Sequence, residues 1–213
     1  MGMPALGLAL LAFYGLLAFG LRMAVALRRT GSTGFKGLRG ASGSVARICE
    51  LLLAMAIMLC LVGGPALQLA GVLDSVGVLD GEGANILGIV LASLGIVLTV
   101  VAQFAMGDAW RIGVDPSEQT ELVADGPFSV VRNPIYTAMI PAFIGIALLA
   151  PNVVTIAGAI LLMVALELQT RIIEEPYLLA VHGEEYAAYG TQVGRFLPGI
   201  GCLRRISSAQ PGA

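Results

Sequence analysis

The chain has 213 residues, of which 57% are hydrophobic and only 12% are charged, and its formal net charge is -2. Soluble domains carry about 25% charged residues, so this composition excludes an ordinary soluble domain and indicates a core buried largely against lipid. The small net charge, with no basic run interleaved with aromatic residues, gives no support to nucleic-acid binding.

Five apolar segments follow one another along the chain. A spanning helix needs about 20 apolar residues, and residues 4–27, 48–69 and 86–106 meet this requirement. Residues 135–149 and 153–168 are shorter and flank a Pro-Asn turn, so they predict a tight helical hairpin that need not cross the bilayer completely at both ends. The predicted fold class is all-α: a polytopic membrane protein with five transmembrane helices, including a C-terminal helical hairpin, followed by a cytoplasmic interfacial helix.

The chain is expected to divide into three regions. Residues 1–105 contain the first three transmembrane helices, and residues 106–200 contain a polar loop, the hairpin and the interfacial helix. Residues 201–213 form a tail that is expected to be disordered.

The basic residues orient this arrangement in the membrane. All 12 Lys and Arg residues can be placed on one side, whereas the loop between the second and third helices has none and carries Asp74, Asp80 and Glu82. The positive-inside rule then places the N-terminus outside and the C-terminus in the cytoplasm. Eleven Arg against one Lys, with abundant Ala, Gly and Val, is typical of a GC-rich bacterial genome, so a bacterial plasma membrane is expected.

Two polar clusters interrupt the apolar chain, and the predicted topology places both on the cytoplasmic side. The first reads DGPFSVVRNPIY at residues 125–136, and the second reads RIIEE at 171–175 and HGEEYAAY at 182–189. They resemble two motifs of the isoprenylcysteine carboxyl methyltransferase family and its relatives, the phospholipid N-methyltransferases. These motifs are G-P-[FY]-x-x-x-R-[HN]-P-x-Y before a hydrophobic hairpin and E-E-x-x-L…G-x-E-Y-x-x-Y after it. The resemblance covers about residues 106–198.

The first motif is suited to binding the carboxylate of a ligand. The Arg132 guanidinium is a planar fork of donors that matches a carboxylate. Pro134 fits the first turn of a helix and places Asn133 and Tyr136 near its positive end, where an anion is stabilised. The resemblance implies that these four residues bind S-adenosylmethionine, and the eukaryotic enzymes usually have His where Asn133 stands.

The second motif supplies acids for a cationic cofactor. The resemblance implies that Glu174 and Glu175 hold the ribose or ammonium end of S-adenosylmethionine, and that Tyr186 in the interfacial helix belongs to the same site. Pro176 departs from the family pattern and predicts a kink or a restart of the helix. With no Cys-x-x-Cys motif and no Cys/His pairing, no metal site is expected.

Two charged residues upstream of the acids, Arg171 and Glu167, are candidate catalytic residues. Glu167, Arg171 and Glu175 are spaced four residues apart, so they share one face of a continuous helix. The resemblance implies that Arg171 contacts the carboxylate to be methylated. An acid at the depth of Glu167 is costly and usually paired, so its role is structural or substrate-facing. Trp110 is expected to be an interfacial anchor.

These features lead to one main hypothesis and two alternatives. The main hypothesis is an integral membrane S-adenosylmethionine-dependent methyltransferase that takes a lipophilic or lipid-linked acceptor from the bilayer, with membrane lipids as its surroundings and neither nucleic acid nor metal as a partner. The first alternative is an NADPH-dependent membrane reductase of the sterol-reductase type, and the second is a non-catalytic membrane protein. The nature of the acceptor stays open.

Overall fold

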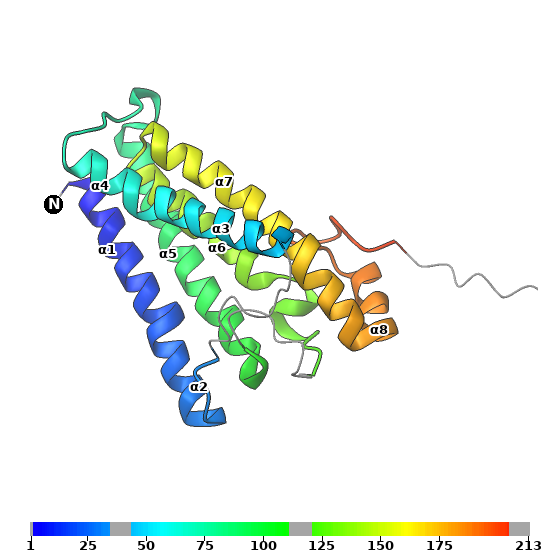
Figure 1. The fold of residues 1–213 in the computed structure, drawn as a ribbon. Helices are drawn as coiled ribbons and strands as arrows, with labels where there is room; N and C mark the ends of the chain where they lie inside the picture. The colour runs from blue at the N-terminus through cyan, green and yellow to red at the C-terminus, as the bar shows by residue number, and fades with distance from the viewer. Residues whose placement is uncertain (1, 35–43, 111–120, 205–213) are drawn as a thin grey trace, which may run out of the picture.

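The computed structural model describes residues 2–34, 44–110 and 121–204, and every regular element within them is a helix (Figure 1). The first helix comprises α1 (Met3–Gly15), the π-helical η1 (Leu16–Leu21) and α2 (Arg22–Thr30). The second comprises α3 (Ser44–Ile57), the π-helical η3 (Met58–Gly63) and α4 (Gly64–Leu69). The third and fourth are α5 (Glu82–Ala105) and α6 (Pro134–Leu149). The fifth comprises α7 (Val153–Gln169), the π-helical η7 (Thr170–Glu174) and α8 (Glu175–Gln192). Short 3-10 turns are η4 (Gly77–Leu79), η5 (Gly107–Ala109) and η6 (Gly126–Ser129).

Four of the described helical segments are long and apolar enough to cross a membrane: Met3–Thr30, Arg47–Leu69, Glu82–Ala105 and Val153–Gln192. Helix α6 is also apolar but has 16 residues, about 24 Å at 1.5 Å per residue, against a hydrocarbon core of about 30 Å. The predicted all-α polytopic fold is therefore confirmed, with the short fourth helix at the predicted place. The side of the membrane on which each terminus lies remains a prediction.

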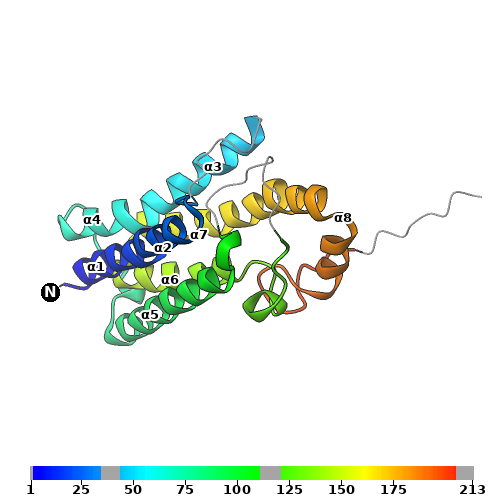
Figure 2. The same ribbon diagram turned by 90° about the horizontal axis from the view of Figure 1, so that it is seen from below.

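The helices run alongside one another in one bundle, with α8 extending beyond one end (Figures 1 and 2). The N-terminus, the α4–α5 connection and the α6–α7 turn lie at the opposite end. Many Leu, Ile and Val side chains of α3 and α5 are exposed on the outside of the bundle, as are Met3 and Phe13 of α1. In a bilayer these faces contact lipid, because exposure of apolar surface to water is unfavourable.

Asn152 holds the α6–α7 turn in place. Its side-chain oxygen accepts hydrogen bonds from the backbone N–H groups of Val154 and Thr155 and so caps α7. Its Nδ2 donates to the carbonyl oxygen of Gly64 at 2.9 Å and to Oε1 of Gln68 at 3.0 Å. The fully buried amide therefore fastens the hairpin to α4.

Small residues allow α5 and α6 to approach closely. A methyl group on Gly145 would lie 2.3 Å from the backbone nitrogen of Ala92, and one on Gly95 would lie 2.4 Å from that of Ala142. Such distances exclude any side chain at either position, as in other closely packed membrane helices. The contact between α5 and α6 packs the predicted region 1–105 against the predicted region 106–200. The boundary at residue 105 remains a prediction.

Arg22 is a buried charge near the other end of the first helix, with 2% of its surface exposed. Its Nη2 donates to the carbonyl oxygen of Gly107, and its guanidinium lies 5.4 Å from the ring centroid of Phe104 and 4.6 Å from that of Trp110. Both aromatic contacts are cation–π interactions. Trp110 is itself 5% exposed because its ring packs against Arg22, and its expected role as an interfacial anchor remains a prediction.

Helix α8 differs from the predicted interfacial helix because it continues directly from α7. The π turn η7 precedes Pro176, which lies in the first turn of α8. Proline removes one backbone donor and crowds the preceding turn, and the wider π turn accommodates it without a restart of the helix. The helix breaks instead at Gly183, whose φ of 55° and ψ of -123° are accessible to glycine.

The break at Gly183 directs the second half of α8 back toward the bundle. The Tyr189 hydroxyl donates to the carbonyl oxygen of Phe128 at 2.6 Å. The backbone N–H of Leu203 donates to the carbonyl oxygen of Gly190 at 2.8 Å. Residues 201–203, expected to begin a disordered tail, are therefore held against the end of α8, because they supply partners to its exposed backbone. Residues 205–213 lie outside the described residues.

Candidate active site

The two motifs meet where the N-terminus of α6 lies beside the segment that follows α8. The backbone N–H of Arg132 donates to the carbonyl oxygen of Gly194 at 2.8 Å, and that of Asn133 donates to the carbonyl oxygen of Arg195 at 3.1 Å. The Thr137 hydroxyl donates to the carbonyl oxygen of Phe196 at 3.0 Å. Residues distant in sequence are thereby brought to one end of the bundle, the end from which α8 extends (Figure 2).

Arg132 is buried and bound to the protein's own C-terminal segment. Its Nη1 donates to the carbonyl oxygens of Gly190, at 3.0 Å, and Val193. Its Nη2 donates to Oε1 of Glu175 at 2.6 Å and to the carbonyl oxygen of Gly201 at 3.0 Å. Among the described residues, its Nε has no hydrogen-bond partner. The guanidinium fork does meet a carboxylate, as its chemistry predicts, but this carboxylate belongs to Glu175.

Asn133 and Pro134 serve the same junction. The Asn133 side-chain amide donates to the carbonyl oxygen of Arg195 at 3.3 Å, and it does not cap α6. Pro134 is buried at the first position of α6, where its missing N–H is not needed. In this structure both residues fix the backbone at the start of α6 against the C-terminal segment.

Arg195 completes the ionic network, and neither motif contains it. Its Nε donates to Oε1 of Glu175 at 2.8 Å, and its Nη2 donates to Oε2 at 2.9 Å. Its Nη1 donates to Oε1 of Glu167 at 2.8 Å. The hydrogen bonds to Glu175 raise the pKa of the Arg195 guanidinium above its ordinary value. Glu175 is therefore fully occupied by two buried arginines, Arg132 and Arg195.

Glu167 and Arg171 form the outer part of this network. Nε of Arg171 lies 2.5 Å from Oε1 of Glu167, in the predicted four-residue spacing. The Arg171 side chain is 59% exposed and the Glu167 side chain 35% exposed. Because Arg195 bonds to both Glu167 and Glu175, the two acids lie on one side of the helix, as predicted. Arg171 points outward and is the exposed cation of the group.

Glu174 has different surroundings from its neighbour Glu175. It accepts a hydrogen bond from the Tyr136 hydroxyl, and the Gln169 side chain lies close to the same carboxylate. No arginine or lysine among the described residues forms an ion pair with it. The π turn explains the contact with Gln169, because residues five apart align in a π-helix.

Two buried atoms in the residues five and four positions before Glu174 have unused hydrogen-bonding capacity. Oε1 of Gln169 and Oγ1 of Thr170 are buried, and neither has a hydrogen-bond partner within the part of the chain that the structure describes. Leaving a buried polar atom unpaired costs about 1–3 kcal/mol. Tyr136, Glu174, Gln169 and Thr170 are called the Glu174 cluster below. Its acceptors fit a ligand that brings hydrogen-bond donors.

Tyr186 supports the network from the folded-back half of α8. It is 2% exposed, and its ring centroid lies 6.0 Å from that of Tyr189. Its side chain lies close to Arg132. The neighbouring Glu184 and Glu185 are exposed and take no part in the described ionic network.

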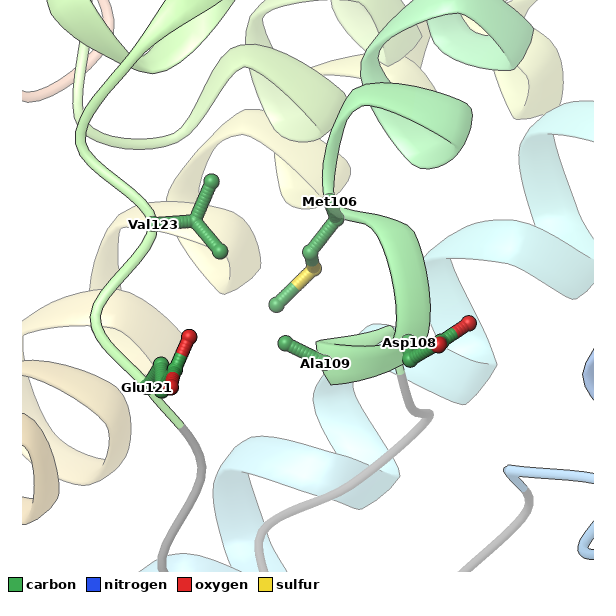
Figure 3. Close-up of a pocket in the computed structure, with 5 residues that line it drawn as sticks. All are labelled: Met106, Asp108, Ala109, Glu121 and Val123. Carbon is green, nitrogen blue, oxygen red and sulfur yellow. The ribbon is translucent and has the colours of Figure 1, made fainter. Parts of the chain in front are cut away.

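An open pocket of about 440 Å³ lies outside these groups. It is lined by Met106, Asp108, Ala109, Glu121 and Val123. Figure 3 shows the Met106 and Val123 side chains pointing toward each other across it, with Asp108 pointing away. None of the predicted site residues lines this pocket. Among the described residues, no group of three or more His, Cys, Asp or Glu side chains is placed to hold a metal ion.

Comparison with known proteins supports the resemblance read from the motifs. Residues 84–185, a little under half of the chain, match the family described as phospholipid methyltransferase. The chain is 27% identical over 109 residues to the nickel-cobalt-cadmium resistance protein NccN of Alcaligenes xylosoxydans xylosoxydans, covering 51% of each protein. It thus spans about half the length of that curated relative.

The fold is similar to that of a solved membrane enzyme. The structure of the eukaryotic intramembrane Ras methyltransferase ICMT (isoprenylcysteine carboxyl methyltransferase) matches with a TM-score of 0.58 at 20% identity, covering 92% of this chain and 66% of that one. The fold is that of a polytopic membrane protein and is similar to the fold of this intramembrane methyltransferase. Residues 84–185 are similar to the phospholipid methyltransferases, and the fold is similar to that of the isoprenylcysteine carboxyl methyltransferase, in agreement with the resemblance of the motifs.

Proposed function

We propose that this protein is an integral membrane S-adenosylmethionine-dependent methyltransferase acting on a lipophilic acceptor. The Glu174 cluster is the observation that carries the proposal. The cluster consists of a carboxylate, a phenol and two unpaired buried oxygens at one end of an apolar bundle. Among the described residues, the carboxylate has no ion-pair partner. It also lies inside the span that matches the phospholipid methyltransferase family.

Tyr136 and Glu174 keep the predicted role of contacting the cofactor. Arg132, Asn133, Pro134, Glu175 and Tyr186, which were also predicted to contact it, build the wall of the site by fixing α6, α8 and residues 193–201 together. When bound, the cofactor supplies an electrophilic methyl carbon, to which the acceptor's lone pair bonds as the carbon–sulfur bond breaks and its electrons neutralise the sulfonium.

The remaining residues orient the acceptor and exclude water. Arg171 is exposed and can meet an anionic group on a molecule that approaches from the lipid, while Glu167 holds Arg171 by their ion pair. Methyl transfer to a carboxylate or thiolate requires little acid–base chemistry, so alignment and removal of water supply most of the rate. A site without a catalytic triad is consistent with this reaction.

The reductase alternative has less support. The 2′-phosphate of NADPH calls for a cluster of available cations. Of the arginines described at this site, Arg132 and Arg195 are buried and bound to Glu175, and Arg171 is paired with Glu167. A non-catalytic role leaves the unpaired oxygens of Gln169 and Thr170 without an explanation.

Ligand titration of the purified protein in detergent tests the proposal. We expect S-adenosylhomocysteine to bind in the micromolar range, about -8 kcal/mol, and NADPH not to bind. Glu174→Gln should weaken binding of S-adenosylhomocysteine, whereas Glu185→Gln, an exposed acid in the same helical region, should not. Tight binding of NADPH with no response to S-adenosylmethionine or S-adenosylhomocysteine would refute the proposed reaction.

A further inference from the structure

The unpaired oxygens beside Glu174 differ from the other unpaired groups of the bundle. Five buried side-chain atoms lack a partner in the described part of the chain, namely those of Gln103, Arg132, Thr155, Gln169 and Thr170. Thr155 lies at the other end of α7 and packs against Gly64, with its Oγ1 where a methyl group on that glycine would be. Gln169 and Thr170 alone are adjacent in sequence, and both lie one helical turn before Glu174.

The Thr170 hydroxyl lacks the partner that a helix normally offers, and Oε1 of Gln169 also has no partner within the described residues. A threonine hydroxyl in a helix commonly donates to the carbonyl group four residues earlier. The Thr170 hydroxyl makes no such bond. The carbonyl oxygens of Leu166 and Glu167 accept from the backbone N–H of Thr170. Thr170 is 0% exposed and Gln169 is 9% exposed, so water does not replace the missing partners. The chain maintains this arrangement at an energetic cost.

The number of hydrogen-bond acceptors, together with the negative charge of the Glu174 carboxylate, indicates which chemical group of a ligand would bind here. Oε1 of Gln169 accepts hydrogen bonds, Oγ1 of Thr170 can accept them, and Glu174 adds a carboxylate. A primary ammonium group carries three N–H donors, no acceptor and a positive charge. Three oxygen atoms around one ammonium group would use all three donors.

We propose that Gln169 and Thr170, together with Glu174, bind the ammonium group of the amino-acid end of the cofactor. This inference rests on the proposed function and assigns to two residues a role that neither motif includes. Tyr136 orients the Glu174 carboxylate through its hydroxyl group. The π turn η7 is the structural cause, because it brings Gln169 and Glu174 onto one face of the helix.

The test compares two ligands and three variants of the full chain. S-adenosylhomocysteine contains the ammonium group, whereas 5′-methylthioadenosine has the same nucleoside without the amino-acid end. Thr170→Val and Gln169→Leu should each weaken S-adenosylhomocysteine binding about tenfold, the fold-change for one hydrogen bond to a charged group. Both should leave the affinity for 5′-methylthioadenosine within about twofold of wild type, and the ligand-free thermal midpoint should stay the same or rise.

Thr155→Val is the matched control, because it removes another buried and unpaired threonine hydroxyl from the same helix. It should leave the affinity for both ligands unchanged. Unchanged S-adenosylhomocysteine binding in Thr170→Val and Gln169→Leu would overturn the inference. Equal losses for both ligands would also overturn it, by placing these residues at the nucleoside. Failure of the wild-type protein to bind S-adenosylhomocysteine would refute the proposed function itself. Gln169→Met replaces Gln169→Leu if the latter does not fold.

Discussion

Arg195 grips Glu175 with two parallel hydrogen bonds, from Nε to Oε1 at 2.8 Å and from Nη2 to Oε2 at 2.9 Å. This bidentate geometry is the strongest form of the arginine–carboxylate contact. Arg132 donates to the same carboxylate from the opposite motif at 2.6 Å. The Glu175 carboxylate thus joins α8, the start of α6 and the segment after α8, and its neighbour Glu174 remains available for a ligand.

The adjacent acids should therefore respond differently to removal of their charge. Glu175→Gln leaves the buried Arg132 without its counter-charge and leaves Arg195 with Glu167 alone, and breaking a buried pair in this way costs about 3–5 kcal/mol. Glu174→Gln removes a charge that has no arginine partner among the described residues, so its thermal midpoint in detergent should be close to that of wild type. Circular dichroism during heating measures both effects. Equal midpoints for the two variants would contradict the division of roles.

Arg132→Lys should destabilise the protein although the charge is kept. A lysine ammonium cannot reach the carbonyl oxygens of Gly190 and Gly201 and the Glu175 carboxylate with the geometry of a planar fork. We expect a loss of about 1.5–3 kcal/mol, the range for a hydrogen bond to a charged group. The control is Arg29→Lys, since the exposed Arg29–Asp108 pair at 3.8 Å should contribute little. A stability loss in the control of the same size would indicate a general effect of the substitution.

Arg195→Gln tests the residue that lies outside both motifs. It removes the bidentate contact with Glu175 and the bond to Glu167, so we expect lower thermal stability. The double variant Arg195→Gln with Glu175→Gln should be less destabilised than the sum of the single variants, because each single change removes the same contact. The expected coupling is about 0.5–3 kcal/mol. Strict additivity in the thermal measurements would show that the two side chains do not interact.

The α5–α6 contact predicts opposite results for two glycine substitutions in the bundle. Gly145→Ala should destabilise by more than about 1–3 kcal/mol, because the new methyl group would lie 2.3 Å from the Ala92 backbone nitrogen and the helices must separate. Gly83→Ala in the first turn of α5 meets nothing within 4 Å. It should be neutral or stabilising, by up to about 1 kcal/mol, because alanine favours the helix. Thermal unfolding of both variants in the same detergent makes the comparison.

The predicted orientation can be checked by labelling single cysteines. Asp80→Cys in the α4–α5 connection and Arg204→Cys in the segment after α8 are both at exposed positions. The α4–α5 connection and the segment after α8 lie near opposite ends of the bundle (Figure 1). In a background without Cys49, Cys60 and Cys202, a membrane-impermeant thiol reagent applied from outside should label the first position and not the second. Labelling of both from one side would refute the five-helix topology and the cytoplasmic site.

The sequence by itself determined the helices of this protein and the regions that carry its polar motifs. Apolar runs of membrane-spanning length and a Pro-Asn turn are local signals, so the first four helices agree closely with the predicted ranges, whereas the fifth continues past residue 168 into η7 and α8. The i, i+4 pair of Glu167 and Arg171 could also be predicted, because helical spacing alone brings these side chains together. Order and spacing of the two motifs were sufficient to indicate the phospholipid methyltransferase relationship.

Only the tertiary structure decided which polar groups pair with one another. The left-handed backbone of Gly183 turns the chain back, and the bonds between residues 131–133 and 194–196 then bring Arg195 to Glu175. No periodicity in the sequence relates these positions, and Arg195 had no signal beyond its positive charge. The partner of a buried charge depends on which distant segment of the chain the fold places next to it. The motif arginine Arg132 could therefore be expected to grip a carboxylate, but the sequence did not specify that this carboxylate is Glu175.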